Sequence, residues 1–248
     1  MAGITTITEL SFEDPTLIEG LPGVGLVGKI AADHLIDTFD MTYFGAVRCE
    51  GLAPVAVYHE DESTVKPPVR LYGDPERELV VLHSDVPITG ERREEFAACL
   101  VGWLEHNGVL GVFLSGLPHS EGDKSGTPGT FGVATGGATD VLEDHEIATP
   151  NQTGVVSGPT GALLHEAMAH EMDAIGLVVE ANPQFPDPRA ARALLEEAIG
   201  PISGVEIDTS ALDEQAEEIR SARQRLAKRM QQSPTEESSQ AQPLPGFQ

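Results

Sequence analysis

Apolar runs rich in β-branched residues alternate along this chain with segments of helical periodicity. Strands are expected at Thr16–Ile18, Tyr43–Arg48, Pro54–His59, Leu79–His83, Val109–Leu114 and Ile175–Ala181. The run Leu79–His83 is apolar on both faces, which is typical of a strand inside a sheet. This alternation predicts βαβ units, and therefore an α/β domain with a mostly parallel sheet that is flanked by helices.

The helical segments carry recognisable start and stop signals. They are expected at Ile30–Ile36, Glu91–His106, Ala162–Met172 and Pro188–Ile199. Asn107-Gly108 ends the second of them, and Gly200-Pro201 ends the last. The compact domain is therefore expected to span residues 1–204.

Two segments differ in composition from this core. Residues from Ser115 to Gly137 are mostly Gly, Ser, Thr and Pro, so we expect a functional loop or a mobile flap. Ser210 and Asp213 have the spacing of a capping box, and an amphipathic helix is expected within 205–230, with acids early and bases late. Residues 231–248 are polar and contain Pro, which predicts a disordered tail.

The charge balance limits the possible partners. The 248 residues include 15 Lys and Arg against 40 Asp and Glu, a formal charge of -25. Such a chain is repelled by phosphates, which argues against binding to nucleic acid or to an anionic membrane. No stretch approaches the roughly 20 apolar residues of a membrane span. We expect a soluble, cytoplasmic protein that is adapted to concentrated salt, where self-repulsion is screened.

The cysteines and histidines suggest no metal or cofactor. Cys49 and Cys99 are too few to hold a tetrahedral metal, and we expect both to be reduced and buried. His165 and His170 are five residues apart, so they point in different directions on a helix and cannot share one ion. The sequence therefore predicts no metal site and no cofactor.

A glycine-rich turn follows the first predicted strand. Gly23, Gly25 and Gly28 match the dinucleotide pattern GxGxxG, and Gly23 to Lys29 match the first part of a phosphate loop. Ile30 stands where a phosphate loop needs a Ser or Thr for Mg²⁺, and no acid is well placed for a ribose. Either these four residues hold a phosphate, or the glycines let a helix turn tightly against the sheet.

Serine hydrolysis has weak support. Ser115, Ser125 and Ser157 each precede a glycine, and His83, His119 and Asp85 are available elsewhere in the chain. No GxSxG elbow frames any of these serines, and Ser-Gly pairs mostly belong to turns. No catalytic residue is assigned.

The segment Ile18–Leu35, which reads IEGLPGVGLVGKIAADHL, closely resembles the N-terminal signature of the PAC2 family, the archaeal relatives of eukaryotic proteasome assembly chaperone 2. Three later blocks are similar more loosely: Gly111–Gly116, Gly158–Leu164 and Pro188–Leu195. The resemblance extends over Leu17 to Ile199. It implies a phosphorylase/hydrolase-like α/β domain that forms homo-oligomers and binds proteasome subunits without catalysis, in a haloarchaeal setting given the charge.

The resemblance also indicates candidate contact residues. Chaperones of this family often end in a hydrophobic residue, a Tyr and one further residue, which dock between proteasome α subunits. Here Phe247 and Gln248 follow Gly246, so Phe replaces Tyr and Gly replaces the hydrophobic residue. An exposed Phe with a free carboxylate still suits insertion into a basic pocket. The alternative function, an ATP-grasp-like carboxylate-amine ligase, would use Gly23–Lys29 for phosphate.

Overall fold

The computed structural model describes residues 3–49, 52, 54–58, 63–88, 90, 93–118 and 127–217. The strands are β1 (Gly3–Thr6), β2 (Thr16–Gly20), β3 (Thr42–Arg48), β4 (Val69–Asp74), β5 (Leu79–Ser84), β6 (Leu110–Pro118), β7 (Thr130–Thr135) and β8 (Ala174–Ala181). The helices are η1 (Val24–Leu26), α1 (Val27–Thr38), α2 (Arg93–Asn107), α3 (Thr139–Asp144), α4 (Gly158–Ala169), α5 (Pro188–Leu194), η2 (Leu195–Ile199) and α6 (Gly200–Ser203). Residues 210–217 are also helical.

The described strands form one mixed sheet in the order β1-β3-β4-β5-β2-β6-β8-β7. Only the three central pairings, β5 with β2, β2 with β6 and β6 with β8, are parallel. The other four are antiparallel. The prediction of a mostly parallel sheet is therefore wrong: β4 and β5 are joined by a four-residue turn, too short for the crossover that parallel strands need.

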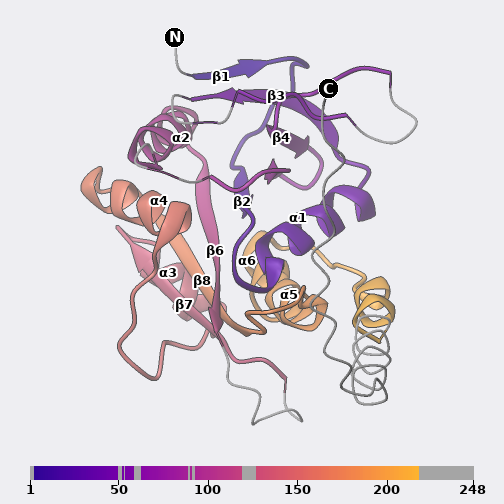
Figure 1. The fold of residues 1–248 in the computed structure, drawn as a ribbon. Helices are drawn as coiled ribbons and strands as arrows, with labels where there is room; N and C mark the ends of the chain where they lie inside the picture. The colour runs from indigo at the N-terminus through magenta and orange to yellow at the C-terminus, as the bar shows by residue number, and fades with distance from the viewer. Residues whose placement is uncertain are drawn as a thin grey trace, which may run out of the picture.

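Two apolar layers bury the sheet from opposite sides. One contains Ile18 of β2 with α1, α5, η2 and α6, and the other contains Leu17 of the same strand with α2 and α4. Figure 1 shows α2 and α4 on one side of the central strands and α1, α5 and α6 on the other. Neighbouring residues of β2 therefore contribute side chains to both apolar layers, because successive side chains of a strand point to opposite faces.

Several expectations need correction. Residues 54–58 form no strand and make a single bridge between Val57 and Lys66. β6 extends to Pro118 and β7 begins at Thr130, so much of the expected loop Ser115–Gly137 is sheet. Residues 127–129 and 136–137 are described outside these strands, and residues 119–126 lie outside the described residues.

The two cysteines are joined, contrary to the expectation that they are reduced. A disulfide links Cys49, which follows β3, to Cys99 of α2, with 5.9 Å between their Cα atoms. The two residues are 50 positions apart, and only the packing of α2 near the end of β3 brings them together. This bridge fastens one covering helix to the antiparallel part of the sheet.

Candidate functional site

The glycine-rich turn after β2 is tightly packed. Gly25 has φ of 63°, and a Cβ added there would lie 3.1 Å from the Ala181 Cβ and 3.2 Å from the Asn182 carbonyl oxygen. A Cβ on Gly28 would lie 3.2 Å from the Leu21 carbonyl oxygen. These two glycines therefore allow the turn and α1 to approach the ends of β2 and β8, and their close neighbours fill the space that a side chain would need.

Lys29 of α1 is turned toward the sheet end. Its Nζ lies 3.1 Å from Asp33 Oδ1 and 3.0 Å from His83 Nε2. Burial opposes ionisation of Asp33, but hydrogen bonds from His83 and Lys29 outweigh it, and the pKa of Asp33 falls below its usual value. The ammonium is thus paired within the protein.

A buried arginine anchors the same cluster. Arg70 of β4 is 1% exposed, and its Nη1 donates to Asp85 Oδ2 at 2.6 Å. Its Nη2 lies 3.1 Å from His83 Nδ1, which we assign as an acceptor because a guanidinium only donates. Nε2 of His83 then carries the hydrogen, which it donates to Asp33 Oδ1 at 2.9 Å. The Lys29 ammonium only donates, so it is paired with Asp33 and not with the His83 Nε2 that lies 3.0 Å away. Two cations, two carboxylates and one imidazole therefore satisfy one another.

On the opposite face of the sheet, a single carboxyl group is buried without an ionic partner. Glu19 of β2 is 0% exposed, and it accepts hydrogen bonds from the Leu21 amide at 3.0 Å, the Leu114 amide at 2.9 Å and the Thr160 hydroxyl at 3.1 Å. Burial raises the pKa of Glu19 to about 7, although the three donors partly offset it. Glu19 thus ties together β2, β6 and the first turn of α4.

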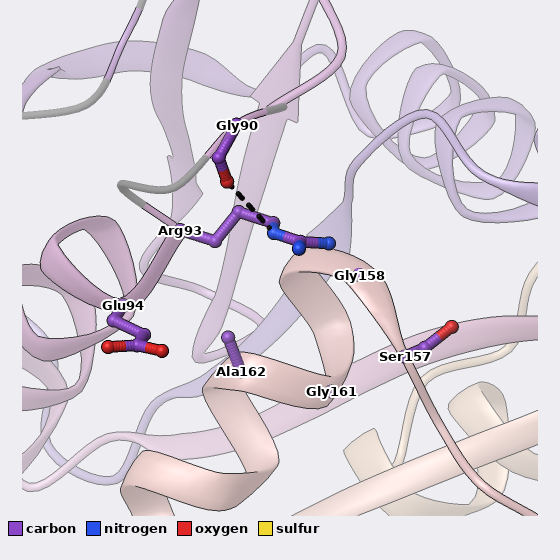
Figure 2. A pocket seen from close by; sticks show the side chains of 7 residues that line it. All are labelled: Gly90, Arg93, Glu94, Ser157, Gly158, Gly161 and Ala162. Carbon is purple, nitrogen blue, oxygen red and sulfur yellow. Dashed lines mark hydrogen bonds between the residues drawn. The ribbon is translucent and has the colours of Figure 1, made fainter.

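A cavity of about 480 Å³ opens beside that turn. It is lined by Gly90, Arg93, Glu94, Ser157, Gly158, Gly161 and Ala162. Figure 2 shows the Arg93 guanidinium extending toward Gly158, while its Nε donates to the Gly90 carbonyl oxygen at 3.1 Å. Small residues of α4 line one side of this space, and Arg93 and Glu94 bring one positive and one negative charge to it.

The remaining predicted residues are scattered. His170 pairs with Glu105 and Glu166 rather than with His165, and no group of acids, histidines or cysteines in the described ranges could hold a metal ion. Phe247 and Gln248 lie outside the described residues, as do Ser125 and His119. The phosphate interpretation of Gly23, Gly25, Gly28 and Lys29 receives no support from the packing around them.

Sequence reasoning missed the two most deeply buried charged groups. Glu19 and Arg70 each interrupt an otherwise apolar run, in TLIEG and VRLYG. A charged residue inside such a run is a usable signal, because a charge is rarely buried fully unless it is paired or hydrogen-bonded.

Comparison with known proteins places this mixed α/β fold in a class. The family model of PAC2 matches residues 17–227. The chain therefore belongs to the PAC2 family. An uncharacterized protein of Methanocaldococcus jannaschii is 30% identical over 221 residues, which cover 88% of each chain. Proteasome assembly chaperone 2 of Danio rerio is 28% identical over 116 residues, 44% of this chain and 45% of the fish protein.

Solved structures agree over nearly the whole chain. Pyrococcus furiosus PbaA, described as an archaeal homolog of proteasome-assembly chaperone, matches with 26% identity and a TM-score of 0.76, over 92% of this chain and 93% of its own. Pyrococcus furiosus PbaB, described as an archaeal proteasome activator, matches with 25% identity and the same TM-score, over 92% and 100%. None of the helices in the described ranges is long and apolar enough to cross a membrane.

Proposed function

We propose that this protein is a chaperone-like factor that self-associates and binds proteasome α subunits or related protein clients without catalysing a reaction. The observation that carries the proposal is the match to PbaA over 92% of the chain, with a TM-score of 0.76. The PbaB match and the fish chaperone support the same partner class.

The arrangement of polar groups is consistent with a binding protein. Lys29 and Arg70 are both paired with carboxylates, so neither is left to hold a phosphate. Arg93 extends toward small residues at the cavity, and the Ser157 hydroxyl that lines the same space has no histidine or aspartate beside it among the other lining residues. These groups stabilise a surface rather than assemble an acid, a base and an anion clamp around one reacting atom.

The proposed contact is the C-terminal end of the chain. Phe247 provides an aromatic ring and Gln248 a terminal carboxylate, which together suit a basic-walled pocket between subunits. We also propose that the interaction takes place in the cytoplasm of a salt-adapted archaeon, because a charge of -25 is best tolerated where electrostatic repulsion is screened.

Binding to immobilised α subunits from the same source tests this contact. The full chain should bind, and removal of residues 243–248 should weaken binding at least about tenfold, or about 1.4 kcal/mol. Phe247→Ala should account for most of that loss, while Phe247→Tyr should bind as well as or better than the natural sequence. Binding that is equal for the full and shortened chains would refute the role of the tail.

A further inference from the structure

The Thr160 hydroxyl faces two acceptors with one hydrogen. Its Oγ1 lies 3.1 Å from Glu19 Oε2 and 3.2 Å from the carbonyl oxygen of Leu114. Because a hydroxyl donates a single hydrogen, it bonds well to one of these acceptors at a time. The protonation of Glu19 decides which one.

Both forms of Glu19 fit this arrangement. When Glu19 is ionised, Thr160 donates to Oε2. When Glu19 is neutral, its hydroxyl at Oε2 donates to Thr160 Oγ1, and Thr160 donates onward to the Leu114 carbonyl. The Leu21 and Leu114 amides keep oxygen acceptors in both forms. A glutamine side chain at position 19 could not replace the carboxyl group, because its amide nitrogen accepts no hydrogen bond and would face one of these two backbone amides.

The Thr160 bond also reaches the cavity wall. Thr160 lies in the first turn of α4, between Gly158 and Gly161, which line the space opposite Arg93 (Figure 2). A change in the bond between Glu19 and Thr160 therefore acts directly on one side of the cavity. It also acts on the contact between α4 and α2.

Within the part of the chain that the structure describes, no charged side chain bonds to Glu19. The titratable or charged groups on the elements around it are His83 of β5, Lys29, Asp33, His34 and Asp37 of α1, His165 and Glu166 of α4, and Arg93, Glu94, Glu95, Glu105 and His106 of α2. None of these groups forms a hydrogen bond with Glu19 in the described part of the chain. The neighbouring strand β6 carries no titratable side chain. His83 pairs with Gly20 in the ladder and is engaged by Arg70 and Asp33. Among the described residues, an ionised Glu19 is therefore stabilised by three neutral hydrogen-bond donors, the Leu21 and Leu114 amides and the Thr160 hydroxyl.

We propose that Glu19 and Thr160 form a proton-controlled latch that sets the position of the first turn of α4, and with it the cavity between α2 and α4. In the neutral form, the chain from Glu19 through Thr160 to Leu114 holds the turn against β6. In the ionised form, the buried negative charge favours entry of water, and the turn loosens from the strand ends. A pKa of about 7 for Glu19 places this change near neutral pH.

Hydrogen exchange of the full chain, followed by mass spectrometry, tests the latch. After correction for the intrinsic pH dependence of exchange, peptides from 158–169 should lose protection between about pH 6 and about pH 8, at least about tenfold. Peptides from α5, on the other side of the sheet, should not change. Constant protection of 158–169 over this range would overturn the proposal.

Variants identify the groups involved. Glu19→Gln should abolish the transition. Thr160→Ser keeps the hydroxyl and should keep the transition, whereas Thr160→Val removes the hydroxyl that links Glu19 to the Leu114 carbonyl and should abolish it. His165→Gln removes the imidazole carried by α4 itself and should leave the transition in place.

The comparison of Thr160→Val with Thr160→Ser tests the latch even if Glu19→Gln fails to fold. A transition of the same size in Thr160→Val and Thr160→Ser would contradict the latch. So would a transition that disappears in His165→Gln.

Discussion

The two faces of the central strands bury their charged groups in opposite ways. On the α1 side, Lys29 and Arg70 meet Asp33 and Asp85, so positive and negative charges lie within 3.1 Å of each other. On the α4 side, Glu19 has only neutral donors. Paired charges resist a change of pH, whereas a lone buried carboxyl group responds to it. The first face should therefore be sensitive to loss of a partner, and the second to protons.

Breaking the paired face should have the largest effect. Arg70→Met leaves Asp85 and His83 without their main donor, and we expect the free energy of unfolding to fall by about 3 to 5 kcal/mol. Urea denaturation measures the loss. Arg192→Met is the matched control, because Arg192 is 39% exposed and its partners Glu196 and Asp213 are 40% and 55% exposed, and it should lose less than about 1 kcal/mol. Equal losses in the two variants would show that the buried network does not hold this face together.

The disulfide should matter next, and only on the α2 and α4 side. Cys49→Ser/Cys99→Ser opens a link between residues 50 positions apart, and a loop of that length predicts a loss of up to about 4 kcal/mol. Urea denaturation of the natural chain with and without a reductant gives the same comparison. A chain that is equally stable in both conditions would contradict a stabilising bridge.

The lone carboxyl group should make stability fall as pH rises. Glu19 has a pKa of about 7 when folded against 4.5 as its ordinary value, so between these values the unfolded chain releases its proton first. The resulting loss in the free energy of unfolding is absent below about pH 4.5 and complete above about pH 7. It amounts to about 3 kcal/mol, because each pH unit contributes about 1.4 kcal/mol.

Denaturation from about pH 5 to about pH 8 measures this penalty as the difference between the natural chain and Glu19→Gln, since other groups then cancel. As pH rises, the free energy of unfolding of the natural chain should fall by about 3 kcal/mol relative to that of Glu19→Gln. A difference that stays constant would show that Glu19 does not titrate in this range.

The smallest effect is expected from Lys29. Its side chain is 26% exposed and its partner Asp33 is 44% exposed, so Lys29→Ala should lower the free energy of unfolding by no more than about 1 kcal/mol. The loss should shrink in concentrated salt, which screens exposed pairs more than buried ones. A loss as large as that of Arg70→Met would place Lys29 among the essential charges of this face.

Periodic patterns predicted the interior of the fold well. The run Leu79–His83 lies within β5, and Pro188 begins α5, where the Asp187 side chain accepts from the Ala190 amide. Local signals suffice for these elements, because an apolar run or a helix cap involves only residues that are close together in the sequence.

Some of the antiparallel strands and the buried charges were harder to predict. β4 was missed because Arg70, Gly73 and Asp74 interrupt its apolar pattern, and β7 because Thr130–Thr135 lies in a Gly- and Thr-rich stretch. β7 pairs with β8, which begins at Ala174, and the bond between Cys49 and Cys99 also joins residues far apart in the sequence. Glu19 was visible as an acid in an apolar run, but its link to Thr160, 141 residues away, was not.

The measurement that tests the central claim most directly is size-exclusion chromatography with light scattering, on this protein alone and mixed with proteasome α subunits from the same source. Salt of about 2 M screens nearly all nonspecific charge effects. We predict a discrete oligomer that shifts to a larger, co-eluting complex when the subunits are added. Two separate peaks with unchanged masses would contradict the proposed chaperone-like function.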